Sequence, residues 1–460
     1  MNSQAIMTPY PEYKATNLPW LPQIPAHWDI VPFAACAKEK SITNQSDLEL
    51  LSVYLDRGVI RFSQEAAKRT NVTSEDLSKY QRVDVGDLVL NNQQAWRGSV
   101  GVSSFTGIVS PAYIVLKLSD RLYSKFANYL FRDNLMVAHY VTASKGIGSI
   151  QRNLYWVNLK RKNLFLPPID EQEQIVRYLD SMMAKINKLI RAKKKQIALL
   201  QEQKQAIINQ AVTKGLNPNA EMKDSGIDWL GQIPVHWTIK NFSKVASIKS
   251  NLVKPENYYD YPQVSPDKIE KHTGKLLPVI SVKEAGIISN NHLFFKGQIL
   301  YSKIRPLLNK VTIAPFDGLC SADMYPIETI LETEYLKFFM LSTWFLYQIK
   351  QSGDRVKMPK INQEEMAKLE IVIPTRKEQK DIVCFIYEHW NQFDIVLQSL
   401  EKSIQTLSEY KNSLIASVVT GQVDIRNIQV EDFDPADLIS ETDDDPPEDD
   451  DQPQEESEVE

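Results

Sequence analysis

Two sets of basic, amide and planar side chains have the composition that contacts with nucleic acid require. Basic groups neutralise phosphates, and polar or planar groups can reach the edges of bases. The candidates in the first half of the chain are Gln93, Gln94, Trp96, Arg97, Lys145, Gln151, Arg152 and Asn153. Those in the second half are Lys303, Arg305, Lys310, Arg355, Lys357 and Lys360. The alternative for each residue, a place in a solvated loop, stays open at this stage.

Sequence motifs for catalysis are absent or incomplete. There is no Gly-x-x-x-x-Gly-Lys-Ser/Thr phosphate loop, no His-Glu-x-x-His and no Gly-x-Ser-x-Gly. The stretch Ser110-Pro111-Ala112-Tyr113 lacks the second proline of an amino-methyltransferase loop, and no glycine-rich methyl-donor loop accompanies it. We therefore expect no catalytic residue, no metal site and no cofactor in this chain. The chain is thus interpreted as a DNA-binding protein without catalytic activity of its own. The alternatives are an autonomous DNA methyltransferase or nuclease, and a coiled-coil scaffold that does not bind DNA.

The formal net charge of −5 is the sum of two unlike parts. Residues 431–460 contain 16 acidic residues and no Lys or Arg, whereas residues 1–430 contain 53 basic and 42 acidic residues, a net charge of +11. A basic body suits an anionic partner. The acidic end has too few apolar residues to offset the entropy of ordering the chain, so we predict a disordered tail over residues 431–460.

Composition also bears on the compartment. The three cysteines are odd in number and widely spaced, which favours a reducing compartment over a disulfide framework. The sequence has no signal-peptide core and no run of about 18 apolar residues that could span a bilayer. We expect a cytoplasmic protein.

The sequence repeats itself once. Residues 18–41 and 227–250 share 12 of 24 positions at an offset of 209, and residues 167–213 and 374–420 share 13 of 47 at an offset of 207. A weaker similarity at an offset of 211 lies between these blocks. Repeats of this kind determine the architecture. The chain is therefore one unit of about 205 residues used twice.

Each repeat ends in a long segment that is predicted to be a helix. Residues 171–214 and 376–419 contain no Gly or Pro, and apolar residues recur at steps of four and three, the pattern of a coiled coil. Thr375 with Glu378, and Asp170 with Glu173, have capping-box spacing. Gly215 and Gly421 are positioned to end the helices. We expect the two helices to pair with each other.

The segments between these landmarks predict an α/β (α+β) fold with two globular domains in pseudo-two-fold repeat, separated by two long antiparallel helices. Strands are expected over 48–54, 87–91, 99–104 and 113–118, and helices over 122–141 and 334–350. The predicted divisions are an N-terminal segment (1–17), a first domain (18–166), a first long helix (167–214), a linker (215–228), a second domain (229–373), a second long helix (374–421) and the acidic tail (431–460).

This order resembles the specificity (S) subunit of type I restriction-modification systems. The similar motifs are the helix starts LPPIDEQEQIV and IPTRKEQKDIV, the helix ends AVTKGL and VVTGQVDI, and the linker MKDSGIDWLGQIPVHW. The segments GDLVLNNQQAWRGSVGVSSFTGIVSPAY and GQILYSKIRPLLNKV also resemble target-recognition domains of that family. The resemblance covers residues 13–428, and the tail lies outside it.

The resemblance implies a non-catalytic DNA sequence-specificity subunit. Each domain would read one half of a bipartite, asymmetric DNA target, and the helices would set the gap between the halves. The partners implied are double-stranded DNA and two methyltransferase (M) subunits that use S-adenosylmethionine. Restriction (R) subunits that use ATP and Mg²⁺ can join them. The expected location is the cytoplasm of a prokaryote, in association with the nucleoid.

Overall fold

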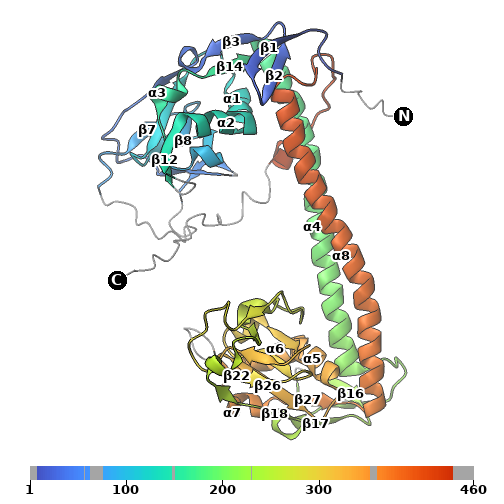
Figure 1. Ribbon diagram of the computed structural model, residues 1–460. Coiled ribbons are helices and arrows are strands. Elements are labelled where there is room, and N and C mark those ends of the chain that lie inside the picture. Colours follow the sequence, from blue (N-terminus) through green and yellow to red (C-terminus); the bar gives the residue numbers. More distant parts are fainter. Residues whose placement is uncertain are drawn as a thin grey trace. The chain divides into compact units, whose positions relative to one another are not determined.

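The structure is a computed structural model that describes residues 8–55, 57–62, 76–147, 151–228, 230–352 and 360–438 (Figure 1). The chain forms two compact units, one comprising residues 1–194 and 402–460 and the other residues 195–401. Helices α4 (Ile169–Lys214) and α8 (Arg376–Val419) each contribute to both units. Each unit therefore combines one mixed α/β domain with part of both long helices.

The first unit is built around the four-stranded antiparallel sheet β4-β11-β8-β9. Helix α1 packs against β9, and the aromatic core includes the stacked pair Phe33 and Phe131, whose ring centres are 5.1 Å apart. Its elements are β1 (Tyr13–Leu18), β2 (Leu21–Pro25), β3 (Asp29–Pro32), η1 (Phe33–Ala35), β4 (Ala37–Glu39), β5 (Leu51–Tyr54), β6 (Gly58–Arg61), β7 (Gln81–Val83), β8 (Leu88–Asn91), η2 (Ala95–Arg97), β9 (Val100–Val102), β10 (Gly107–Val109), β11 (Tyr113–Leu118), α1 (Ser124–Arg132), α2 (Asn134–Ala143), β12 (Ser144–Ile147), β13 (Gln151–Leu154), α3 (Trp156–Leu159), β14 (Asn163–Leu166) and η7 (Pro435–Leu438).

The second unit repeats this sheet as β18-β26-β23-β24 and adds the five-stranded sheet β19-β22-β25-β20-β21. Among its named strands, only the pair β20 and β25 is described as parallel. Its elements are β15 (Met222–Asp224), β16 (Gln232–Pro234), β17 (Thr238–Asn241), η3 (Phe242–Lys244), β18 (Ala246–Ile248), β19 (Leu252–Val253), η4 (Pro255–Tyr258), β20 (Pro262–Val264), η5 (Pro266–Lys268), β21 (Ile280–Ser281), β22 (Asn291–Phe294), β23 (Ile299–Ser302), η6 (Pro306–Leu308), β24 (Val311–Ile313), β25 (Gly318–Cys320), β26 (Met324–Thr329), α5 (Thr333–Leu341), α6 (Thr343–Ser352), α7 (Gln363–Lys368) and β27 (Glu370–Ile373).

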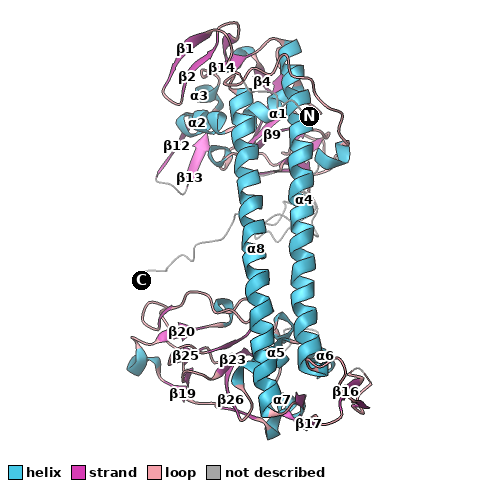
Figure 2. Ribbon diagram, turned by 90° about the vertical axis from the view of Figure 1, so that its right-hand side faces the viewer, coloured by secondary structure: helices cyan, strands magenta, loops and turns pink. Residues whose placement is uncertain are grey.

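The sequence repeat is a structural repeat as well. Strands β8, β9, β10 and β11 and the turn η2 correspond to β23, β24, β25, β26 and η6 at a constant offset of 211. Helices α1 and α2 correspond to α5 and α6 at an offset of 209, and α4 begins 207 residues before α8 (Figure 2). The predicted mixed α/β fold with two repeated domains is therefore confirmed.

Two helix predictions are wrong in the same way. The segment predicted as one helix over 122–141 is broken at Asp133, and the segment over 334–350 is broken at Ser342. Both residues have extended backbone angles, and the Asp133 carboxylate accepts a hydrogen bond from the Leu135 amide at 2.9 Å. Asp and Ser favour this position before a helix because their side chains satisfy its first amides. Each predicted helix is therefore two short ones.

The long helices follow the predicted register and pack together in both units. Lys204 contacts Asp394 at 2.6 Å in the second unit, and Lys411 donates a hydrogen bond to Asn187 at 3.2 Å in the first. At the offset of 207, Lys204 corresponds to Lys411 and Asn187 to Asp394. The same contact thus occurs twice with the helices exchanged, which is the signature of an antiparallel pseudo-two-fold pair.

A buried tryptophan in each unit contacts the start of one long helix and the end of the other. In the first unit Trp28 donates a hydrogen bond to Glu171 at 2.9 Å, and a Cβ added to Gly421 would lie 3.1 Å from the Trp28 ring. In the second unit Trp237 donates to Glu378 at 3.1 Å, and a Cβ on Gly215 would lie 3.0 Å from its ring.

Both helix-ending glycines have positive φ, 75° at Gly215 and 71° at Gly421, as their predicted role requires. Thr375 and Glu378 form the predicted capping box, with amide-to-side-chain distances of 3.0 and 3.3 Å. Asp170 is not a cap, because α4 begins one residue earlier.

The first eight residues of the predicted acidic tail have a described position. Ser181 donates a hydrogen bond to the Glu431 carbonyl at 3.1 Å, and residues 435–438 form the turn η7. These residues find polar partners on α4, which composition alone does not show. The prediction of a disordered tail thus concerns residues 439–460 only, and these lie outside the described residues. Among helices of the described ranges, none combines the length and the hydropathy needed to cross a membrane.

The Glu378 carboxylate generates a prediction about stability. Burial raises its pKa, but hydrogen bonds from Thr375, His236 and Trp237 outweigh that effect and lower the pKa from 4.5 to about 2. Because the folded pKa is the lower one, this stabilisation is present above pH 4.5 and is lost as the pH falls towards 2. We expect Glu378→Gln to lower the free energy of unfolding by about 1 kcal/mol at pH 5.5 and by clearly less at pH 3.

Urea unfolding midpoints at the two pH values measure this difference. Glu401→Gln is the matched control, because Glu401 is exposed on the same helix. A deficit of equal size at both pH values would contradict the assignment.

Candidate nucleic-acid interface

Around the Trp96 ring, in the loop between β8 and β9, lie three of the other predicted residues of the first domain. The guanidinium carbon of Arg97 lies 5.0 Å from the centre of the Trp96 ring, and that of Arg152 lies 6.0 Å from it. The Trp96 indole N–H donates to the Gln93 carbonyl at 2.8 Å, which fixes the ring against its own loop. Arginines at these distances interact favourably with an aromatic face. Residues more than fifty positions apart in the sequence therefore form one cluster.

The hairpin β12–β13 brings Arg152 to this loop. The Leu154 amide donates to the Asn92 carbonyl at 3.0 Å, which joins the hairpin to the loop through the backbone. Lys145 and Asn153 face each other in the hairpin register, and both are exposed. Gln94 lies partly buried in the loop, where its carbonyl accepts hydrogen bonds from the Arg97 and Ser99 amides. The side chain of Gln151 lies outside the described residues.

The equivalent loop of the second domain lies between β23 and β24. The Ile361 amide donates to the Lys303 carbonyl at 3.0 Å, and these two residues correspond to Leu154 and Asn92 of the first domain. Gly98 at the end of η2 has a φ of 106°, and Asn309 at the equivalent position has a φ of 45°. The loops thus share their attachment and their backbone turn, although their side chains differ.

A pocket of about 300 Å³ lies beside the second loop. Arg305, Lys310 and Lys360 line it together with the acidic residues Asp267 and Asp323. Lys360 pairs with Asp323 at 3.5 Å. The Lys310 ammonium donates to the Pro266 carbonyl at 2.7 Å, so this residue is partly committed to the fold.

The other predicted residues of the second domain differ in position. The Lys303 ammonium lies 5.5 Å from the centre of the Tyr325 ring, and Lys303 does not line the pocket. Burial, assisted by the nearby Lys303 charge, lowers the pKa of His292 and favours its neutral form. Arg355 and Lys357 lie outside the described residues. The structure therefore brings three of the six predicted residues to one pocket.

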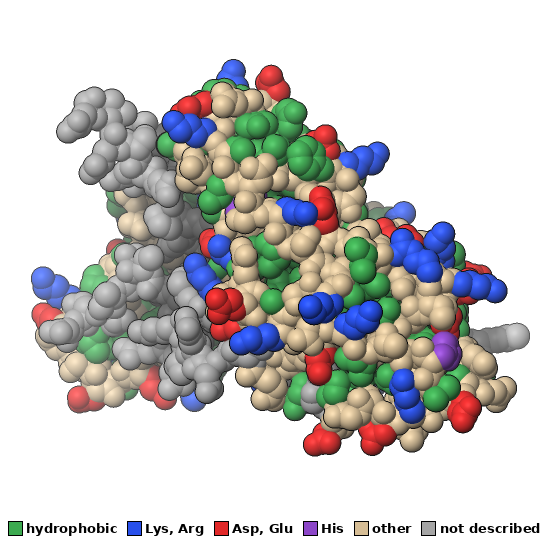
Figure 3. Space-filling model, turned by 90° about the horizontal axis from the view of Figure 1, so that it is seen from below, with side chains coloured by type: hydrophobic (Ala, Val, Ile, Leu, Met, Phe, Trp, Pro, Cys, Tyr) green, Lys and Arg blue, Asp and Glu red, His purple; other side chains and the backbone are tan. Residues whose placement is uncertain are grey.

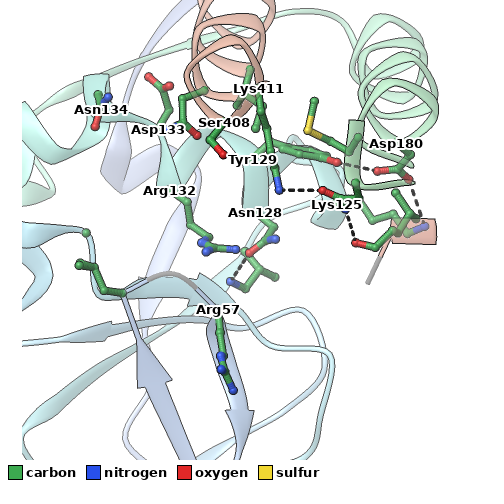
Figure 4. A pocket seen from close by; sticks show the side chains of 18 of the residues that line it. Arg57, Lys125, Asn128, Tyr129, Arg132, Asp133, Asn134, Asp180, Ser408 and Lys411 are labelled. Carbon is green, nitrogen blue, oxygen red and sulfur yellow. Dashed lines mark hydrogen bonds and ion pairs between the residues drawn. The ribbon is translucent and has the colours of Figure 1, made fainter. Parts of the chain in front are cut away.

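A larger basic groove in the first unit escaped the sequence analysis. It has a volume of about 980 Å³ and extends from Arg97 and Gly98 to helices α4 and α8 (Figure 4). Its basic residues come from separate parts of the chain, so no local sequence pattern marks them. On the face of the molecule in Figure 3, Lys and Arg are intermixed with Asp and Glu, so charge marks no single patch on that face.

The interface offers contact groups and no evident reaction centre. Within the described part of the chain, no group of three or more His, Cys, Asp or Glu side chains is arranged to hold a metal ion. The duplicated histidines contact carboxylates, His27 with Glu171 at 2.7 Å and His236 with Glu378 at 2.9 Å. These pairs join the domains to the helix starts.

Comparison with known proteins defines the class. The profile of the type I restriction modification DNA specificity domain matches residues 43–199 and 234–405. The type I restriction enzyme EcoDI specificity subunit of Escherichia coli is 29% identical over 348 residues, which cover 72% of this chain and 77% of the relative. A putative type I restriction enzyme MjaX specificity subunit of Methanocaldococcus jannaschii is 22% identical over 381 residues, covering 77% and 82%.

A solved chain from work on complex assembly and conformational transition of the type I R-M system has the same fold. Its TM-score is 0.64 at 13% identity, and the match covers 87% of this chain and 99% of that chain. A duplicated protein with two DNA-specificity domains is thus defined by profile and fold together. The chain belongs to the type I restriction-modification DNA specificity family. Its function is DNA sequence specificity, which is a non-catalytic role.

The cluster around Trp96 generates a second prediction. We expect Arg152→Gln to weaken binding of the chain to duplex DNA, because a positive charge beside the loop is lost. If Arg152 contacts a phosphate, the slope of log affinity against log salt becomes shallower by about 1 on every duplex. If it contacts a base, the loss is confined to the target sequence.

Binding isotherms at several salt concentrations measure this effect. Arg161→Gln is the control, because Arg161 is exposed in the same unit but is not one of the arginines placed over the Trp96 ring. If Arg152→Gln and the unaltered chain bind all duplexes with equal affinity, Arg152 does not contribute to DNA binding.

Proposed function

We propose that this chain is the specificity subunit of a type I restriction-modification complex and that each domain reads one half of a bipartite, asymmetric DNA target. The observation that carries the proposal is the pair of equivalent loops with different side chains. At the offset of 211, Trp96 corresponds to Leu307 and Arg97 to Leu308. A shared scaffold with different contact groups is what two different half-sites require.

The contact residues proposed for the first half-site are Gln93, Gln94, Trp96, Arg97, Lys145, Gln151, Arg152 and Asn153. Those proposed for the second are Lys303, Arg305, Lys310, Arg355, Lys357 and Lys360. Arg groups suit guanine and the amides of Gln and Asn suit adenine in the major groove. Lys310 is the exception in this set, because its half-buried ammonium donates to the Pro266 carbonyl, which favours a role in positioning the loop over a direct phosphate contact.

The helices α4 and α8 are proposed to set the gap between the half-sites and to dock two methyltransferase subunits. The repeated contacts of Lys204 and Lys411 support this, because a pseudo-two-fold pair offers equivalent surfaces to two identical partners. In such a complex the methyltransferase partners would carry S-adenosylmethionine, and restriction subunits would carry ATP and Mg²⁺. The complex would act in the cytoplasm, on the DNA of the nucleoid.

Exchange of one domain tests whether each domain reads one half-site. Residues 29–165 are replaced by the matching domain of a relative with a different target, and the complex is copurified with its methyltransferase partner. We expect methylation mapping of the host genome to show one altered half-site and one unaltered half-site. Changes in both halves would contradict the proposal that each domain reads one half.

Insertion of one heptad into each helix tests the spacer role. The symmetric insertion points are between Lys195 and Gln196 and between Lys402 and Ser403, midway between the two repeated contacts. Seven residues add about 10 Å of helix, or at most about three base pairs of B-DNA. We expect a longer gap with both half-sites unchanged in the methylation map. An unchanged gap would count against the spacer role.

A further inference from the structure

The basic groove of the first unit is lined by residues from the domain and from both long helices. Seven of its lining residues are basic and two are acidic. Arg57, Arg97, Lys125 and Arg132 come from the domain, whereas Lys194 and Lys411 come from α4 and α8. Figure 4 labels Lys125 and Arg132, both of α1, together with Arg57 and with Lys411 of α8. The groove therefore concentrates positive charge that is dispersed in the sequence.

The two acidic residues of the groove already have partners. Asp180 accepts a hydrogen bond from the Tyr129 hydroxyl at 2.8 Å and pairs with Lys125 at 3.7 Å. Asp133 caps α2 through the Leu135 amide, and burial raises its pKa. The groove thus keeps a net positive charge and suits an anionic occupant.

The chain that follows α8 runs along α4 towards this groove. Gln174 donates to the Ile428 carbonyl at 2.9 Å, Ser181 to the Glu431 carbonyl at 3.1 Å and Asn187 to the Leu438 carbonyl at 3.0 Å. The donors advance along α4 as the acceptors advance along the chain. Leu438 itself lines the groove. Leu438, the last described residue, therefore lies at the rim of the groove, and residues 439–460 follow directly from it.

Charged contacts accompany this path. Glu431 pairs with Lys185 at 2.7 Å, and Asp437 pairs with Arg191 and, at 3.9 Å, with Lys188. Exposed pairs of this kind are individually weak. The hydrogen bonds from the buried Ser181 and Asn187 side chains fix the path, and the charges select an acidic segment.

The basic face of α4 has no counterpart in the second repeat. In α4 it consists of Lys185, Lys188, Arg191 and Lys194, and the equivalent positions of α8 are Gln392, Ile395, Gln398 and Glu401. Ile395 is 70% exposed, so no segment covers it among the described residues. In a duplicated chain, a feature confined to one repeat points to a task confined to that repeat. Among the described residues, an acidic segment lies beside this face of α4 and none covers the equivalent face of α8 at Ile395.

We propose that residues 439–460 dock in the basic groove of the first unit and compete there with DNA phosphates. This segment has 22 residues, of which 12 are acidic and none is Lys or Arg. Its extended length, about 70 Å at roughly 3.3 Å per residue, is ample for a groove at whose rim it starts. The competition with DNA rests on the proposed function, whereas the docking rests on the groove and the path of residues 425–438.

A tethered competitor acts at high effective concentration. A short flexible tether gives a local concentration in the millimolar range, which suffices for weak charged contacts to be occupied without DNA. Screening by salt weakens the contacts of both competitors. DNA would displace the segment when specific contacts add to the phosphate contacts, so the segment would disfavour binding to non-target DNA most.

Zero-length crosslinking tests the docking. A carbodiimide joins carboxylates to lysine amines, and mass spectrometry of the full chain identifies the lysines joined to residues 439–460. We expect crosslinks to Lys125, Lys194 and Lys411, and their loss when a mixed-sequence duplex is added. Crosslinks that are equally frequent at Lys249 and Lys296 of the second unit, or absent from the groove, would overturn the docking.

DNA affinity tests the competition. The matched variant keeps the length of the chain but replaces the 12 acidic residues of 439–460 by Asn and Gln. We expect it to bind the mixed-sequence duplex about tenfold more tightly than the unaltered chain at low salt, with little difference at about 0.5 M salt. A chain ending at Leu438 should behave as the neutral variant does.

The two measurements separate the possible failures. If the groove crosslinks persist in the presence of DNA and the neutral variant binds DNA with unchanged affinity, the docking is supported but the competition is refuted. That result would also show that DNA does not bind in this groove. Unchanged affinity without groove crosslinks would refute the whole inference, while domain exchange would still test the proposed half-site reading.

Discussion

The contact of one tryptophan with both long helices is the constraint on which each unit depends. Trp28 contacts Glu171 at the start of α4 and Gly421 at the end of α8, and Trp237 makes the reciprocal contacts with Glu378 and Gly215. The indole N–H needs an acceptor because it is buried, and the carboxylate supplies one. The glycines leave the space that a Cβ would fill. Each domain is therefore fixed to two helix ends at once.

This attachment lets the recognition loops vary without cost to the fold. The loop after β8 and the loop after β23 are held by equivalent backbone hydrogen bonds, among them those from Leu154 to Asn92 and from Ile361 to Lys303. Backbone groups make these contacts, so the loop side chains are not needed for them. Trp96 and its arginines can thus occupy a position where the second domain has leucines. The side chains proposed to contact DNA are thus largely separate from the backbone groups that hold the loops in place.

The sequence predicts the features that depend on local pattern. Helix periodicity, the Thr375 cap and the two terminal glycines are all visible in consecutive residues, and the structure confirms them. The breaks at Asp133 and Ser342 carried a signal, since both residues favour the position before a helix, but the surrounding apolar residues suggested one continuous helix. The local capping contacts of Asp133 and Ser342 decided the structure there.

The basic groove and the path after α8 were not predictable from local pattern. Arg57, Arg132 and Lys411 are far apart in the chain, and only the fold brings them together. The charge count also predicted disorder for all of residues 431–460. Residues 431–438 instead have a described position, because the Ser181 and Asn187 side chains donate hydrogen bonds to their carbonyls. For the same reason Lys310 looked available in sequence, although its ammonium donates to the Pro266 carbonyl.

Fusion of two repeats in one chain explains how symmetry and asymmetry coexist. Two identical copies joined about a two-fold axis would present identical loops, and could read only identical half-sites. In a single chain each repeat can change by itself, as the loops at Trp96 and Leu307 and the helix faces at Lys188 and Ile395 have done. The packing contacts keep the symmetry because each serves both halves. The surfaces proposed to contact DNA and the acidic segment are therefore where the two repeats diverge, whereas the helix surfaces proposed to dock two identical methyltransferase subunits keep the symmetry.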